Sequence, residues 1–139
     1  MIKKKHILLV LLILSGTFLT EGSIHANIPN PYEIWQQKSI KIGMASWYSE
    51  QDPGIRKTTA NMEIFDDTQL TAAMWDVPFH QRIKVTNLVN GQSVVVRVND
   101  RGPHRRFVRQ GRLIDLSKAA FGKIASLKEG LIDIQLEYL

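Results

Sequence analysis

The chain has 139 residues, of which 44% are hydrophobic and 22% charged, values typical of a single globular domain rather than a disordered chain. It contains no cysteine, which excludes disulfides, thiolate metal sites, thiol catalysis and a lipid-modified N-terminal cysteine. Residues 1–26 carry three lysines and one glutamate, so the net charge of +5 falls to +3 without them. This mild charge does not indicate a nucleic-acid-binding surface.

The first 26 residues have the organisation of a secretory signal peptide. A basic start with three lysines precedes an aliphatic run at residues 7–14, and a polar stretch leads to Ala26 as a cleavage point. We therefore expect residues 1–26 to be removed and the protein to be periplasmic or secreted. Because Ile24 is larger than the residue usually found at its place before a cleavage site, an uncleaved N-terminal membrane anchor is the alternative.

Residues 27–38 are polar and contain prolines, which indicates an N-terminal arm or linker before the folded domain at 39–139. The domain begins with an alternating segment at 39–48, which predicts a strand that ends in Trp47 and Tyr48. Neighbouring aromatic side chains at a strand end can stack on sugar rings or pack at the edge of a core. The sequence leaves both interpretations open.

The clearest local unit is a β-hairpin. Residues 82–88 and 92–98 each alternate apolar with polar side chains, which is the period of a half-buried strand. Asn90 and Gly91 lie between them, and this pair is typical of a type I′ turn in which both residues have positive φ.

Further strands are expected on both sides of this hairpin. The segment at 69–73 favours a short strand, and residues 131–139 alternate clearly as a last strand. Residues 114–127 carry a helical stripe instead, with Asp115 and Ser117 as candidate N-caps. Five or six short strands with one short helix predict a small all-β barrel.

The strand at 92–98 runs directly into the turn sequence NDRGP at 99–103. Asp100 is thereby placed at a strand end, where a carboxylate can be held rigidly and still face a groove, as a general acid must. The other interpretation is that Asp100 only caps the turn. Five arginines from Arg101 to Arg112 form either a solvated loop or a patch for an anionic, carboxylate-bearing substrate.

Other kinds of chemistry find little support in the residues. The two histidines of the predicted domain, His80 and His104, have no metal-ligand spacing, and no glycine-rich phosphate loop or serine nucleophile motif occurs. We therefore expect no cofactor and no metal ion. Carboxylates are the remaining candidates, and both Asp100 and Glu63 lie on segments flanked by turns.

A resemblance to a known family is carried by six segments in matching order and spacing. They are GMASWY at 43–48, TAN-x-E-x-FD at 59–66, LTAA at 70–73, VTNL-x-NG at 85–91, VVVRVNDRGP at 94–103 and GR-x-IDLS at 111–117. Together they resemble the rare lipoprotein A family, over residues 43–139. The resemblance implies a six-stranded double-psi β-barrel with one or two short helices, related to expansins and to some endoglucanases.

The same resemblance implies an activity. Members of this family are exported lytic transglycosylases that cleave peptidoglycan glycan strands, preferably free of stem peptides, to 1,6-anhydromuramic acid ends. On this basis Asp100 would be the general acid and base, and Glu63 a second catalytic residue. The residues expected to bind substrate are Arg101, Trp47, Tyr48, Asn99 and Met74. Expected partners are glycan strands and cell-division or cell-wall proteins, with no nucleic acid and no lipid anchor.

One departure from the family pattern suggests a different function. The family's histidine after LTAA is Met74 in this chain, and a thioether cannot share a proton or accept a strong hydrogen bond. The alternative is therefore a weakened or inactive protein on the same barrel that binds glycan or interacts with the division machinery. Met74 favours this alternative, whereas the intact VNDRGP segment favours an enzyme.

Overall fold

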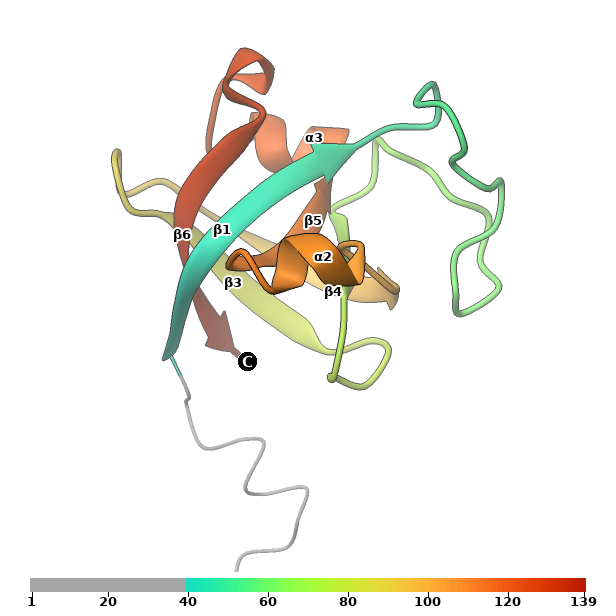
Figure 1. Ribbon diagram of the computed structural model, residues 1–139, viewed down its shortest axis with the longest axis horizontal. Helices are drawn as coiled ribbons and strands as arrows, with labels where there is room; N and C mark the ends of the chain where they lie inside the picture. The colour runs from blue at the N-terminus through green and yellow to red at the C-terminus, as the bar shows by residue number, and fades with distance from the viewer. Residues whose placement is uncertain (1–39) are drawn as a thin grey trace, which may run out of the picture.

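The structure is a computed structural model that describes residues 40–139 (Figure 1). Six strands close into a barrel in the order β1-β5-β2-β4-β3-β6. The elements are β1 Ile40–Tyr48, β2 Thr71–Met74, β3 Arg82–Asn87, β4 Ser93–Asp100, α2 Arg105–Val108, β5 Arg112–Ser117, α3 Lys118–Gly122, the 3-10 helix η1 Leu127–Glu129 and β6 Leu131–Tyr138. This architecture confirms the predicted six-stranded barrel with short helices.

Two of the six strand pairs are parallel, namely β1 with β5 and β2 with β4. The other four neighbouring pairs are antiparallel. Two pairs of strands that follow each other in the chain, β1 with β2 and β4 with β5, are not neighbours in the barrel, and long connections join them. These connections are residues 49–70 after β1 and residues 101–111 after β4. They carry most of the side chains that form the candidate site.

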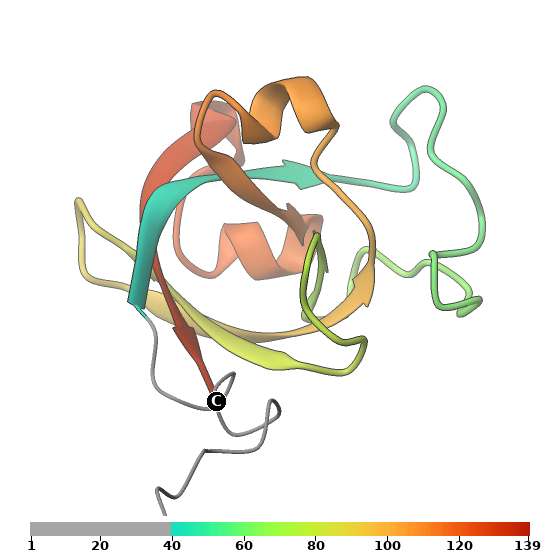
Figure 2. The ribbon, with the colours of Figure 1, turned by 60° about the horizontal axis from the view of Figure 1, so that its bottom comes forward.

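The core follows from the two-residue period of the strands. Val94 and Val96 of β4 are paired with Val85 and Ile83 of β3, and all four side chains are buried. Strand β6 repeats this alternation, so the predicted hairpin strands and last strand are confirmed. Phe121 of α3 is fully buried in the same core, and Figure 2 shows α3 across one end of the barrel.

The turn of the hairpin differs from the predicted type I′ turn. Gly91 has a φ of 73°, but Asn90 is not among the residues with positive φ. The amide of Gly91 donates to the carbonyl of Asn87, which makes a wider turn than a two-residue loop. The side chain of Asn90 donates to the carbonyl of Ile124, 34 residues away, so a tertiary contact holds the turn in this wider form.

Residues 112–117 form a strand, although the sequence predicted a helical segment from residue 114 onwards. β5 is paired on one side with β1 and on the other with β2, and its Ile114 and Leu116 are fully buried. Asp115 therefore lies within a strand and does not cap a helix. Ser117 is the N-cap of α3, since its side chain accepts from the amide of Ala120.

The predicted signal peptide at 1–26 and the predicted arm at 27–38 lie outside the described residues. Between residues 40 and 139, no helix has the length and apolar character needed to span a membrane.

We predict that Asn87→Ala lowers the free energy of unfolding by about 2 kcal/mol, because Asn87 is buried and hydrogen-bonded at both ends. Its Nδ2 donates to the carbonyl of Ile124 at 2.9 Å, and its Oδ1 accepts from the amide of Val89 at 2.9 Å. Denaturant unfolding measures the change. Asn90→Ala is the matched control, and since Asn90 is exposed, its loss should be smaller. Equal losses would contradict the prediction.

Candidate active site

An open pocket of about 480 Å³ lies where β4 meets the long connection after β1. One wall consists of loop residues from the segment 54–62, and the other of Asp100 and Arg101. Thr58 is exposed in the loop wall, so the pocket presents a hydroxyl group beside a carboxylate and a guanidinium group. Such a lining suits a polyhydroxylated ligand better than an apolar one.

Asp100 is the last residue of β4, as the turn sequence predicts. Its Oδ1 accepts from the amide of Ala60 at 2.9 Å and from the amide of Arg101 at 2.8 Å. The first of these bonds ties the loop wall of the pocket to the strand end. Within the described residues Oδ2 accepts no hydrogen bond, so one carboxylate oxygen is held while the other remains available.

A second carboxylate lies beside Asp100 because of the strand register. Ala73 of β2 is paired with Asp100 on β4 and with Asp115 on β5, so the two acidic residues flank the same alanine. Directly paired residues on neighbouring strands place their side chains on one face of the sheet. A Cβ added to Gly102 would lie 3.1 Å from Cβ of Ala73 and 3.5 Å from Oδ2 of Asp115. Glycine therefore allows the turn after Asp100 to pack onto this pair.

Asp115 occupies a much less solvated position than Asp100. Its side chain is 14% exposed, and its Oδ1 accepts from Nε of Arg112 at 2.6 Å. Burial raises the pKa of Asp115, and the charge of Asp100 raises it further, although Arg112 opposes both effects. The sequence analysis interpreted this residue as a helix cap, because an Asp-x-Ser pattern before an apolar stripe also fits a helix N-terminus.

Tyr48 completes this buried group at the end of β1. Its ring stacks on Phe65 with a centroid distance of 4.5 Å, and both rings pack with Ala73. Burial raises the pKa of the Tyr48 hydroxyl, and the charges of Asp100 and Asp115 raise it further. The hydroxyl is buried without a hydrogen-bond partner among the described residues, so it is a neutral donor next to two carboxyl groups.

Glu63 is held by a dense set of hydrogen bonds. Both of its carboxylate oxygens accept from Arg97 at 2.8 Å, and each also accepts from an amide side chain, that of Asn61 at 2.8 Å or of Asn99 at 3.1 Å. The bonds from Arg97, Asn99 and Asn61 lower the pKa of Glu63 to about 2. Glu63 is therefore ionised at neutral pH and is unsuited to donate a proton there.

Arg101 contacts the pocket from the β4 side. Its Nη1 donates to the carbonyl of Met74 at 3.0 Å, and its Cζ lies 3.7 Å from the ring centroid of Phe79. Both contacts orient the guanidinium group without neutralising it. Arg101 thus keeps a positive charge at the pocket wall.

Four residues expected to bind substrate support the site without lining the pocket. Asn99, Met74 and Tyr48 are buried, with exposed fractions of 3%, 4% and 8%. Trp47 packs against the core through Phe121, and its Nε1 donates to the carbonyl of Leu127 at 3.1 Å. The structure thus favours core packing over sugar stacking for the aromatic pair.

Met62 lies in the pocket wall in an unusual backbone conformation. Its φ is 71°, in the left-handed region that costs a side chain with a Cβ about 1–2 kcal/mol. The side chain is 79% exposed, so packing does not compensate this cost. The surrounding hydrogen bonds impose the conformation, since the amide of Met62 donates to the carbonyl of Thr59 and the amide of Asn61 to the carbonyl of Asn99.

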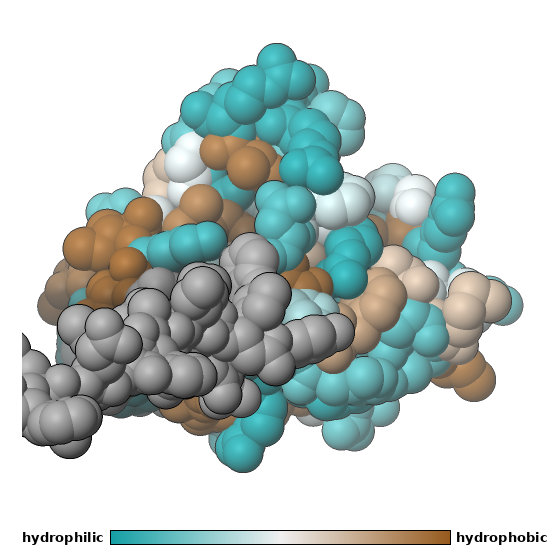
Figure 3. All heavy atoms as spheres, turned by 90° about the horizontal axis from the view of Figure 1, so that it is seen from below, coloured by the Kyte–Doolittle hydropathy of each residue, from teal (hydrophilic) through white to brown (hydrophobic). Residues whose placement is uncertain are grey.

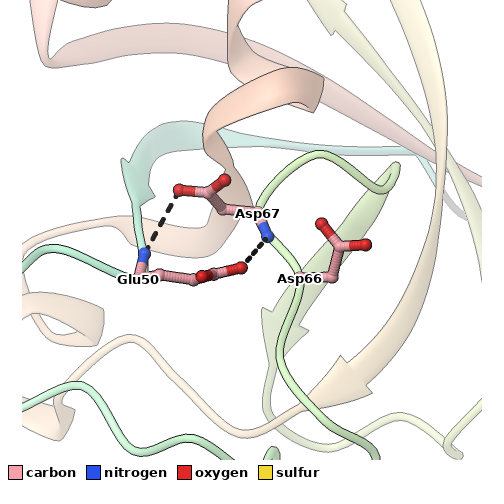
Figure 4. Close-up of side chains that lie close together, drawn as sticks. All are labelled: Glu50, Asp66 and Asp67. Carbon is pink, nitrogen blue, oxygen red and sulfur yellow. Dashed lines mark hydrogen bonds between the residues drawn. The ribbon is translucent and has the colours of Figure 1, made fainter.

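Three other acidic residues lie close together outside the pocket (Figure 4). Carboxylate oxygens of Glu50, Asp66 and Asp67 lie within 4.8 Å of one another, and hard cations prefer such oxygen ligands. However, Glu50 and Asp67 each accept a hydrogen bond from the backbone amide of the other, and Asp66 accepts from the amide of Thr68. These bonds account for the closeness, because they tie the loop after β1 to the next turn.

Comparison with known proteins identifies the family. The family model described as lytic transglycolase matches residues 40–136, which include the pocket and all of the barrel except the last residues of β6. The chain belongs to this lytic transglycolase family. The predicted resemblance to rare lipoprotein A and the double-psi β-barrel fold are thereby confirmed.

Curated members of the lytic transglycolase family are closely similar to this chain. A probable endolytic peptidoglycan transglycosylase RlpA from Synechocystis is 50% identical over 101 residues, which are 72% of this chain and 29% of the relative. Endolytic peptidoglycan transglycosylase RlpA from Vibrio cholerae is 44% identical over 97 residues, 70% of this chain and 35% of the relative. The chain thus spans about a third of the length of these relatives.

Solved structures support the fold alone. The Streptomyces papain inhibitor has a TM-score of 0.57 at 23% identity, covering 73% of this chain and 94% of the inhibitor. An expansin from Clavibacter michiganensis has a TM-score of 0.55 at 20% identity, covering 73% of this chain and 50% of the expansin.

The pKa of Glu63 predicts a pH dependence of stability. Folding lowers this pKa from 4.5 to about 2, so the ionised form stabilises the folded state above about pH 4.5, and this contribution is lost as the pH falls towards 2. The parent should therefore be more stable than Glu63→Gln at neutral pH, and the difference should shrink below pH 4.5. Denaturant unfolding at several pH values measures it. A difference that does not change with pH would contradict the assignment.

The backbone of Met62 predicts a stabilising substitution. Met62→Gly should raise the free energy of unfolding by about 0.5–1 kcal/mol, because glycine adopts positive φ without a Cβ clash. Thermal unfolding would show this as a higher Tm. Ile64→Gly is the matched control, since Ile64 is equally exposed but does not have positive φ, and this change should lower the Tm. A lower Tm for both variants would overturn the strain argument.

Proposed function

We propose that this chain cleaves the glycan strands of peptidoglycan by a lytic, non-hydrolytic reaction that leaves 1,6-anhydromuramic acid ends. The observation that carries the proposal is Asp100, whose carboxylate is anchored through one oxygen at the wall of a polar, open pocket. The family and the names of its curated relatives supply the reaction class and the substrate.

The chemistry of this reaction requires only one carboxyl group at the bond that breaks. The acid form donates its proton to the glycosidic oxygen as the bond from the anomeric carbon to that oxygen breaks. The 6-hydroxyl of the same muramic acid then bonds to the anomeric carbon, and its proton returns to the carboxylate. Water is not consumed, so a second carboxylate to activate water is not needed. We assign both proton transfers to Asp100.

The other charged residues take supporting roles in this proposal. Glu63 is fully engaged with Arg97 and two asparagines, so it positions the loop wall and its bound substrate instead of transferring protons. Asp115 and Tyr48 are shielded from solvent, and both are held next to Ala73, the residue paired with Asp100, so they help to fix the position of this strand end. Arg101 offers a positive charge to an oxyanion of the substrate.

The alternative of a weakened glycan-binding protein depends on Met74. In the structure the Met74 side chain belongs to the main hydrophobic core and does not line the pocket. A thioether at this position therefore leaves the pocket wall intact. No observation favours the alternative over an enzyme.

The cellular setting of the proposal follows from the substrate. Peptidoglycan lies outside the cytoplasmic membrane, so the reaction requires export, which agrees with the signal peptide predicted at residues 1–26. We propose a periplasmic or secreted location. Cell-division or cell-wall proteins are its proposed partners.

The test compares the parent with Asp100→Asn on peptide-free glycan strands, and mass spectrometry detects 1,6-anhydromuramic acid ends. We expect the variant to lose at least about 100-fold in rate, because amide nitrogen cannot replace an acid that transfers protons. Asp133→Asn is the control, since Asp133 is exposed on β6 and does not line the pocket, and it should match the parent. Binding of glycan without anhydro products in the parent would refute the proposed function.

A further inference from the structure

A group of arginines extends from the pocket onto the outside of the barrel. Arg105 and Arg106 belong to α2 and Arg109 caps its C-terminal end, and all three are exposed. We call these three residues the arginine surface. Arg101, which lines the pocket, donates to the carbonyl of Met74, and Arg105 stacks on the next residue, Trp75, so the arginine surface lies next to the wall that contains Asp100.

The position of α2 makes this surface accessible. The helix packs against β5 on the outside of the barrel and projects from it in Figures 1 and 2. In Figure 3 the region where Figure 2 places α2 projects as a block of hydrophilic residues. A ligand that leaves the pocket on this side would therefore meet it.

Aromatic rings hold two of these guanidinium groups in fixed planes. Cζ of Arg105 lies 4.1 Å from the ring centroid of Trp75, and Trp75 is itself fixed by a 2.7 Å hydrogen bond from its Nε1 to the carbonyl of Pro103. Cζ of Arg106 lies 4.5 Å from the centroid of Phe107. Stacking occupies the faces of the guanidinium groups and leaves their N–H edges free to bind an oxyanion.

The positive charge of the arginine surface is barely compensated. Arg105 has a single ion-pair contact, to Asp76 at 3.9 Å, and both side chains are largely exposed, so this pair contributes little. Arg106 and Arg109 form no ion pair with any residue from 40 to 139. Arginines that are ordered by stacking, and not by acidic partners, are preorganised for an external anion.

We propose that the arginine surface binds carboxylates of the glycan strand beyond the cleaved bond. This inference rests on the proposed function, because that function defines a strand long enough to leave the pocket. Muramic acid carries a lactyl carboxylate, which is free where the stem peptide has been removed. The stem peptides carry further carboxylates, so both sources share the chemistry that the arginine surface recognises.

The test measures binding separately from cleavage. Arg105→Gln, Arg106→Gln and Arg109→Gln are combined in an Asp100→Asn background, which prevents turnover during the assay. The ligands are peptide-free glycan strands, peptide-bearing strands and chitin oligosaccharides, which share the sugar backbone but have no carboxylate. The control combines Lys41→Gln, Lys123→Gln and Lys128→Gln, which remove the same charge from exposed positions outside the pocket.

We expect the arginine variant to bind peptide-free strands about tenfold more weakly than the protein that carries Asp100→Asn alone. Its affinity should also depend less on salt. Binding of chitin oligosaccharides should not change, and the lysine control should behave as the parent. An effect on peptide-free strands assigns the lactyl carboxylate, and an effect confined to peptide-bearing strands assigns the stem peptide. Replacing the same three arginines by lysine should restore only part of the affinity, because lysine keeps the charge but loses the planar fork.

Two results would overturn the inference. One is equal affinity of parent and arginine variant for all three ligands, and the other is an equal loss in the lysine control. Thermal unfolding of each variant confirms that the barrel is intact. A third result separates the two proposals. If strands bind through the arginine surface but the protein with Asp100 intact forms no anhydro ends, the proposed function fails and the binding surface stands.

Discussion

The position of β2 between β4 and β5 is the constraint on which the candidate site depends. This strand has only four residues, all buried, yet its Ala73 is paired with Asp100 on one side and Asp115 on the other. A Cβ at Gly102 would lie 3.1 Å from Cβ of Ala73, so the turn after Asp100 packs closely on this alanine. The pairing of β2 therefore brings two carboxyl groups to one face of the barrel.

The surroundings of Glu63 and Asp115 shift the pKa values of these two carboxyl groups in opposite directions. Glu63 accepts four hydrogen bonds from Arg97, Asn61 and Asn99, which favour its ionised form. Asp115 is shielded from water, and its raised pKa shows that burial outweighs its bond from Arg112. Asp100 differs from both in its contacts, because one of its oxygens is anchored to two backbone amides. Such separation of neighbouring carboxyl groups is the usual physical basis for separate roles in catalysis.

One backbone conformation in the pocket wall lowers the stability of the folded protein. Met62 holds a left-handed conformation in the pocket wall with no packing to offset it. Features that cost stability tend to be kept where a ligand makes use of them, which is why this conformation is informative about function.

Local patterns in the sequence predicted the strands of the hairpin, the last strand and the place of Asp100, because two-residue burial and turn chemistry depend only on neighbouring residues. The six matching segments likewise identified the family and its barrel. Only the tertiary structure decided that Asp115 lies beside Asp100, that Met74 faces the core and that Glu63 is bound to Arg97. These facts follow from which strands become neighbours and in what register, and residues distant in sequence determine that choice.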